Sequence, residues 1–169
     1  MSDSTKNNNK LALFIGQAPP EKNYEIPFAK TRLYHWLLNV GITQKEVLDI
    51  FDFEALSDVF PGKSDKGHKA PTSAAIKKYI PTIISKINRN DYKLIVPVGK
   101  LAIEYVLTKP ANLKECIGKS YNICVFGKSK NTLVIPLPHP SGLSTWSFDK
   151  SNKKLLDCAL QMIKQNTDQ

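Results

Sequence analysis

The sequence is poor in cysteine, with three among its 169 residues. Cys116, Cys124 and Cys158 are odd in number, and their spacing matches no zinc or iron–sulfur ligand pattern. Scattered cysteines of this kind are typical of reduced thiols in the cytosol. The pattern therefore predicts neither a disulfide framework nor a metal centre.

Long apolar runs are also missing from the sequence. The run at residues 11–15 is far too short to span a membrane, and residues 1–10 are polar, with three consecutive asparagines, unlike a signal peptide. No internal repeat is present. We expect residues 1–10 to be a disordered tail and residues 11–169 to form one domain of a cytoplasmic protein that does not associate with membranes.

Acidic residues are too few to balance the basic ones. The chain has 24 Lys and Arg against 15 Asp and Glu, which gives a net charge of +9. A basic protein favours polyanionic partners, because clustered cations neutralise phosphates and release counterions from nucleic acid. Lysines that only solvate helices give the same balance. The charge alone therefore does not identify a partner.

Short apolar runs, typical of buried strands, alternate with amphipathic segments typical of helices. Strands are predicted at residues 11–15, 94–99, 123–126 and 133–135, and helices at residues 31–40, 72–87, 100–107 and 151–165. Residues 47–53 are ambiguous but could form the second strand, and residues 60–70 are predicted to be a basic loop. Pro81 lies inside a predicted helix and predicts a kink or break there.

This order of elements predicts the fold class. Alternating strands and helices favour a single α/β domain with a mostly parallel central sheet flanked by helices. In such domains, ligands bind beyond the carboxyl ends of the strands. Residues 16–20 and the segment around His139 follow the first and last predicted strands, so we expect both loops to line one crevice.

The segment from Pro136 to Trp146 is the most informative part of the chain. His139 stands between two prolines directly after an apolar strand, and prolines restrict the backbone at the base of a loop. Ser141 and Gly142 supply a polar, permissive turn, and Leu143 is apolar where a surface loop is usually polar. This combination indicates a loop that acts on a ligand.

Several segments, taken in order, resemble the uracil-DNA glycosylase superfamily over residues 11–146. Each alone occurs in unrelated proteins, so their order and spacing carry the resemblance. With three cysteines, the chain is similar to the branch that has no iron–sulfur cluster. The segments are Gly16-Gln17-Ala18-Pro19-Pro20, Pro27-Phe28, Phe60-Pro61-Gly62-Lys63, Val96 to Ala102, and His139-Pro140-Ser141.

The resemblance implies an enzyme that acts on DNA as a monomer without a cofactor. Such an enzyme flips a deaminated base, usually uracil, out of the DNA and hydrolyses its N-glycosidic bond. His139 matches the histidine that stabilises the departing base, Phe28 the aromatic that stacks on it, and Leu143 the wedge that fills the vacated stack. The other site residues implied are Gly16, Ala18, Pro19 and Ser141 for the substrate, and Gly142, Ser144 and Lys63 for the DNA.

The chain departs from the family pattern at two places, one that positions the attacking water and one that recognises the base. Where several branches place a carboxylate or asparagine in the first loop, this chain has Gln17 and Ala18, so Gln17 is the candidate for positioning the water, with Glu21 or Asn23 as alternatives. Many relatives also read uracil with an asparagine on the second strand. Residues 53–56 contain none, so uracil specificity is open.

Other interpretations of the same residues stay open at this point. His139 could be a structural hydrogen-bonding residue, Phe28 a core aromatic, and Leu143 a side chain packed under its own loop. The basic residues Lys63, Lys66, His68 and Lys69 could contact phosphates or only solvate their loop. The whole protein could be an inactive relative that binds DNA or a nucleobase, or a small-molecule enzyme on the same scaffold.

Overall fold

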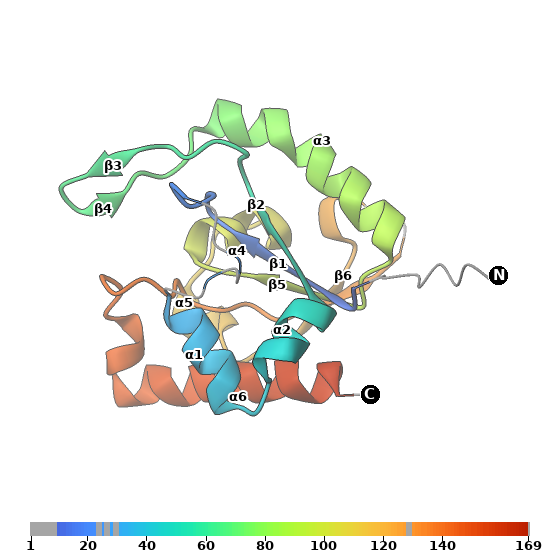
Figure 1. Ribbon diagram of the computed structural model, residues 1–169, viewed down its shortest axis with the longest axis vertical. Helices are drawn as coiled ribbons and strands as arrows, with labels where there is room; N and C mark the ends of the chain where they lie inside the picture. The colour runs from blue at the N-terminus through green and yellow to red at the C-terminus, as the bar shows by residue number, and fades with distance from the viewer. Residues whose placement is uncertain (1–9, 23–24, 26–27, 29–30, 128–129, 169) are drawn as a thin grey trace.

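A five-stranded sheet in the order β2-β1-β5-β7-β6 forms the centre of the protein (Figure 1). The computed structural model describes residues 10–22, 25, 28, 31–127 and 130–168. Residues 1–9 of the expected tail, Asn23 and Pro27 lie outside the described residues. The strands of the sheet are β1 (Ala12–Gly16), β2 (Phe51–Ala55), β5 (Leu94–Pro97), β6 (Tyr121–Ile123) and β7 (Thr132–Val134).

Strands β2, β1, β5 and β7 run parallel, and β6 pairs antiparallel with β7 at one edge. In the registers, Ala12 of β1 lies opposite both Phe51 of β2 and Leu94 of β5. Every residue of β1 and β5 is buried. Continuous apolar strands are typical of a parallel sheet covered on both faces. The predicted fold class, an α/β domain with a mostly parallel sheet, is confirmed.

Helices cover the two faces of the sheet (Figure 1). They are α1 (Arg32–Asn39), α2 (Gln44–Ile50), α3 (Ser73–Asn90), α4 (Lys100–Leu107), α5 (Leu113–Cys116) and α6 (Lys150–Thr167), with 3-10 turns η1 (Val125–Gly127) and η2 (Trp146–Phe148). The connection from β1 to β2 moves towards one edge of the sheet, and the connection from β2 to β5 moves towards the opposite edge. Right-handed crossovers therefore place α1 and α2 opposite α3, as in the figure, where α6 lies beside α1. Within the described residues, no helix is long and apolar enough to cross a membrane.

The second strand begins later than the sequence suggests. Residues 47–50 belong to α2, and β2 starts at Phe51. A capping box starts the helix, because the Thr43 side chain accepts a hydrogen bond from the Glu46 N–H while the Glu46 carboxylate accepts one from the Thr43 N–H. The expectation of a strand from Val47 was wrong because this local cap outweighs the β-branched and apolar composition.

Pro81 does not break α3, which continues from Ser73 to Asn90. The Thr72 side chain caps this helix, as predicted, by accepting from the Ala75 N–H at 3.2 Å. Pro81 lies on the exposed side, and the apolar side of the helix remains packed on the core. The burial of Ile76, Ile83 and Ile87 on this side therefore outweighs the loss of one helical hydrogen bond.

Two loops differ in detail from the prediction. The basic segment 60–70 contains a hairpin of β3 (Lys63–Ser64) and β4 (Gly67–His68), antiparallel to each other. The predicted strand pair near residues 123–135 exists, but β6 ends at Ile123, and a 3-10 turn occupies Val125–Gly127. The hairpin lies at the same end of the sheet as the loop after β1 (Figure 1).

Candidate active site

The loops after β1, β5 and β7 begin side by side at the carboxyl end of the sheet. The Val98 N–H donates to the Ile15 carbonyl, and the Gly99 N–H donates to the Leu137 carbonyl, both at 2.8 Å. Strands β1 and β5 are neighbours, but the chain leaves them towards opposite edges of the sheet. Such a switch point is the usual place for a ligand site in this architecture.

His139 lies directly on the backbone of Gly99, the residue before α4. A Cβ atom added to Gly99 would lie 3.0 Å from Cδ2 of His139, and the φ angle of +90° also disfavours a side chain there. The glycine therefore allows the ring to approach the amino end of α4. The two residues lie 40 positions apart in the sequence, and the pairing of Val98 with Leu137 brings them together.

The loop itself determines which nitrogen of His139 donates hydrogen bonds. The Ser141 N–H donates to Nδ1 at 3.2 Å, so the neutral ring carries its proton on Nε2. Burial by surrounding atoms lowers the pKa of His139 below 6.5, and the nearby His68 lowers it further. The residue still has an exposed surface. The site therefore presents a neutral imidazole with an N–H donor.

Leu143 projects from the His139 loop and contacts the β3–β4 hairpin. Its residue surface is 70% exposed. An added Cβ on Gly67 would lie 2.8 Å from Cδ1 of Leu143, so the leucine lies against bare backbone. The ring of His68 in the hairpin meets the ring of Phe60, which precedes the hairpin, edge to face at 5.1 Å. The structure thus excludes the interpretation that Leu143 is packed away under its own loop.

Phe28 lies over the start of the first loop. Its Cζ is 3.5 Å from the position of a Cβ on Gly16, and its ring lies 5.4 Å from that of Phe53. The backbone of Phe28 has a φ angle of +60°, which is uncommon for an aromatic residue. Thr31 stabilises this turn, because both its N–H and its hydroxyl donate to the Phe28 carbonyl at 2.8 Å. The half-buried ring is thus held between the core and the first loop.

The first loop is joined to the hairpin by an ion pair. Glu21 lies 2.6 Å from Nζ of Lys63, and both side chains are about half exposed. This carboxylate is therefore already engaged by a cation. Gln17, Ala18 and Pro19 are half-buried beyond the end of β1.

Glu54 lies on β2, within residues 53–56, the stretch that lacks the asparagine found in many relatives. Its carboxylate accepts from the Tyr79 hydroxyl at 2.9 Å and from Nζ of Lys86 at 3.3 Å. Burial, together with the hydrogen bond to Glu54, raises the pKa of Tyr79 to about 12. Both partners belong to α3, so Glu54 is directed at that helix.

Arg32, at the start of α1, contacts the His139 loop and was not predicted from the sequence. Its side chain donates to the carbonyls of Ser144 and Gly142, and its N–H donates to the Pro140 carbonyl. The chain has only two arginines, Arg32 and Arg89, among 24 basic residues. That scarcity is the one signal in the sequence that could have directed attention to Arg32.

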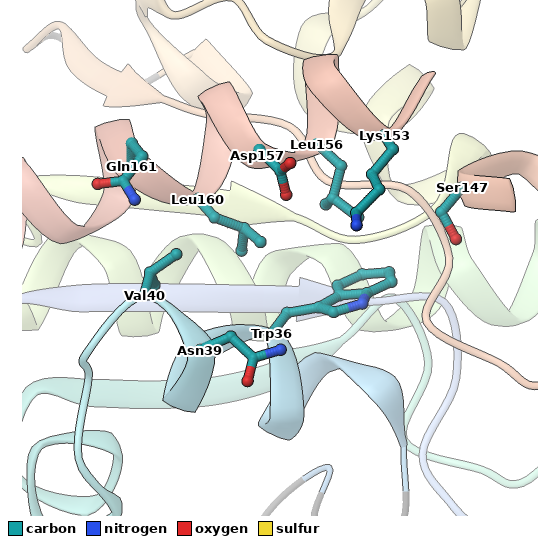
Figure 2. A pocket seen from close by; sticks show the side chains of 9 residues that line it. All are labelled: Trp36, Asn39, Val40, Ser147, Lys153, Leu156, Asp157, Leu160 and Gln161. Atoms are coloured by element: carbon teal, nitrogen blue, oxygen red, sulfur yellow. The ribbon is translucent and has the colours of Figure 1, made fainter. Parts of the chain in front are cut away.

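A groove of about 420 Å³ lies elsewhere, between α1 and α6 (Figure 2). Trp36 of α1 faces Lys153 and Leu156 of α6 across it. None of the residues that the sequence predicts for the site lines this groove. The described residues also contain no group of three or more His, Cys, Asp or Glu side chains arranged to hold a metal ion.

These loops lie within a stretch that matches a known protein family. The family model described as the uracil DNA glycosylase superfamily matches residues 4–162. The chain belongs to the uracil-DNA glycosylase superfamily. No curated protein matches the chain. Membership in the superfamily supports a glycosylase-like role on DNA in general terms, and the matched range includes the His139 loop, the first loop and the hairpin.

Proposed function

We propose that the protein is a DNA glycosylase that flips a deaminated base, first of all uracil, out of DNA and hydrolyses its N-glycosidic bond. The single observation that carries this proposal is the state of His139. Its Nδ1 accepts the Ser141 N–H, and its pKa is lowered, so the neutral ring carries its donor on Nε2 in a residue that remains exposed at the carboxyl end of the sheet. A fixed donor in that position suits an anion that develops on a leaving group.

In the proposed reaction, the bond between the base nitrogen and C1′ of the sugar breaks, and the oxygen of a water molecule bonds to C1′. The proton that this water loses passes to solvent, and the base, which leaves as an anion, takes up a proton after release. The electron pair of the broken bond stays on the base, where the charge spreads to the pyrimidine O2. His139 donates from Nε2 to that oxygen. Loss of one such donor costs about 3 kcal/mol, or roughly a hundred- to thousandfold in rate.

The flipped base is proposed to stack on Phe28, with Gly16, Ala18 and Pro19 lining the same pocket. Support comes from the contact of Phe28 with Gly16, which places the aromatic ring beside the first loop. Ser141 is proposed to hold the phosphate next to the flipped sugar. Gln17 is proposed to position the water through its amide carbonyl, because the carboxylate of Glu21, an alternative candidate in that loop, is paired with Lys63.

The DNA is proposed to lie across the His139 loop and the β3–β4 hairpin. Leu143 would enter the base stack, since an apolar side chain can replace the stacking of the extruded base. Lys63, Gly142 and Ser144 would contact the backbone, with Lys66, His68 and Lys69 alongside. The contact of Leu143 with Gly67 supports this arrangement, because it joins the two parts into one surface.

The substrate is identified by alkali-labile cleavage of oligonucleotides that carry one uracil, hypoxanthine or xanthine, beside an unmodified strand. The proposal expects strand breaks at one of the lesions and none in the unmodified strand. The lesion that is cut names the substrate.

A second candidate is a catalytically inactive member that binds DNA as an accessory protein. Two observations favour it: Ala18 cannot orient water, and Glu54, which lies in the stretch where many relatives place an asparagine, is engaged by α3. The same oligonucleotides distinguish the two. Binding that weakens steeply with salt but leaves every lesion intact would support the inactive member and contradict the enzyme.

A further inference from the structure

Arg32 connects the amino end of α1 to the loop that carries Leu143, over more than 100 residues of sequence. Nη1 donates to the Ser144 carbonyl at 2.8 Å, and Nη2 donates to the Gly142 carbonyl at 3.3 Å. The guanidinium also lies 4.7 Å from the centroid of the Phe148 ring. The backbone N–H of Arg32 adds a bond of 3.2 Å to the Pro140 carbonyl.

The residue type fits these contacts closely. A planar guanidinium can donate to two carbonyls while one face rests on an aromatic ring. The ammonium of lysine is a compact point charge, so it has neither the fixed pair of donors nor a flat face to stack on the ring. Arg32 is one of two arginines in a chain that otherwise uses lysine. A general preference for arginine therefore does not explain its presence here.

The two carbonyls that Arg32 binds belong to the residues on either side of Leu143. A turn within the loop, from the Ser144 N–H to the Ser141 carbonyl at 3.1 Å, closes the same segment. The backbone of Leu143 is thus held on both sides, while its side chain remains 70% exposed. Fixing this segment before binding avoids the loss of conformational entropy that would follow if it were ordered only on the DNA.

We infer that Arg32 is a positioning residue that holds Leu143 ready to enter the base stack. This inference rests on the proposed function of Leu143 as the wedge. Arg32 acts through the loop backbone and does not touch the base or the sugar. Its loss should therefore matter when a base must be extruded from a duplex, and matter little when the base is already unpaired.

The test compares Arg32→Ala and Arg32→Lys on one lesion in duplex and in single-stranded DNA. We expect both variants to slow excision from the duplex by roughly tenfold, as for loss of one charge-assisted hydrogen bond, and to leave the single-stranded rate within about twofold. Leu143→Ala should show the same selectivity, and the double variant should be no slower than Leu143→Ala. Arg89→Ala, which removes the other arginine from α3, is the control and should behave as wild type.

Three outcomes would overturn the inference. Equal slowing on duplex and single strand would assign Arg32 a general structural role. Wild-type behaviour of Arg32→Lys would show that only the positive charge matters. A decrease of about one in the slope of log affinity against log salt would make Arg32 a phosphate ligand. If Arg32→Ala fails to fold, as judged by circular dichroism, Arg32→Lys alone carries the test.

A second readout separates this inference from the proposed chemistry. Fluorescence of 2-aminopurine next to the lesion rises when the neighbouring base leaves the stack, whether or not the bond is cut. A rise with wild type that Arg32→Lys abolishes would support the inference even if no lesion is excised. Excision by wild type with an unchanged rise for Arg32→Lys would support the enzyme and contradict the inference.

Discussion

The ring of His139 lies against the bare backbone of Gly99, at a distance that leaves little room for a side chain on the glycine. Gly99 precedes α4, and His139 follows the last parallel strand, so the contact joins two loops at the switch point of the sheet. The position of the imidazole therefore depends on residue 99 being a glycine, which has no Cβ.

Gly99→Ala should displace the His139 ring. The new Cβ would lie 3.0 Å from Cδ2, and the φ angle of +90° adds strain. We expect the excision rate to fall at least roughly tenfold, since a small misplacement of a catalytic group is costly. Gly127→Ala is the control, because its φ angle is +72° and nothing lies within 4 Å of the added Cβ. Equal rates for the two variants would contradict this account of the contact.

Gly67→Ala should affect the wedge rather than the chemistry. Its Cβ would lie 2.8 Å from Cδ1 of Leu143, and the flexible leucine side chain is expected to move away. Excision from duplex DNA should decrease a few-fold, about 1 kcal/mol, with no change on single strands. Gly62→Ala in the same loop has a similar φ angle of +94° and no neighbour within 4 Å, so it controls for backbone strain. A loss with Gly62→Ala as large as with Gly67→Ala would rule out the contact as the cause.

The excision rate should fall on the acid side only below pH 6.5, where His139 becomes protonated. Protonation of Nδ1 would break its bond with the Ser141 N–H, and burial followed by His68 lowers the pKa of His139, so the neutral ring persists below 6.5. His68→Asn should raise this pKa towards 6.5, because a like charge is removed. NMR titration of the imidazole signals measures the shift, with His35→Asn as the control. A decrease in the pKa of His139 in His68→Asn would contradict the assignment.

The same pKa shift has a consequence for stability. As the pH falls below 6.5, the unfolded chain takes up a proton that the folded His139 takes up only at lower pH. The free energy of unfolding contributed by this group is therefore present above pH 6.5 and is lost as the pH falls through the folded pKa. His139→Asn should weaken this pH dependence, as measured by denaturant unfolding at several pH values.

Glu54→Gln should leave the choice of lesion unchanged. The carboxylate binds Tyr79 and Lys86 of α3, so its loss should lower the free energy of unfolding by about 1–2 kcal/mol and lower the pKa of Tyr79 from about 12. Denaturant unfolding and a spectrophotometric tyrosine titration measure the two effects. A change in the relative rates on uracil and hypoxanthine would instead place Glu54 in base selection.

Much of the fold could be predicted from the sequence because its signals are local. The buried runs at β1 and β5, the cap of Thr72 and the family segments around Gly16 and His139 all depend on neighbouring residues. The start of β2 could not be predicted well, because a capping box and a β-branched residue gave opposite signals at residues 43–50.

The contacts that complete the site depend on distant residues. Arg32 meets the carbonyls of Gly142 and Ser144, and Gly67 meets Leu143, across separations that no local pattern reports. Likewise, the engagement of Glu54 by α3 depends on where a helix packs. Such contacts follow from the topology of the sheet and become visible only in three dimensions.

The most direct test of the central claim is the single-turnover rate of excision by His139→Ala on the lesion that wild type cuts. His35→Ala, which removes an exposed histidine from α1, is the matched control. We predict that His139→Ala is slower by roughly a hundred- to thousandfold, as for loss of an oxyanion donor, while His35→Ala matches wild type. A rate for His139→Ala within a few-fold of wild type would contradict the assignment of His139 as the group that stabilises the departing base.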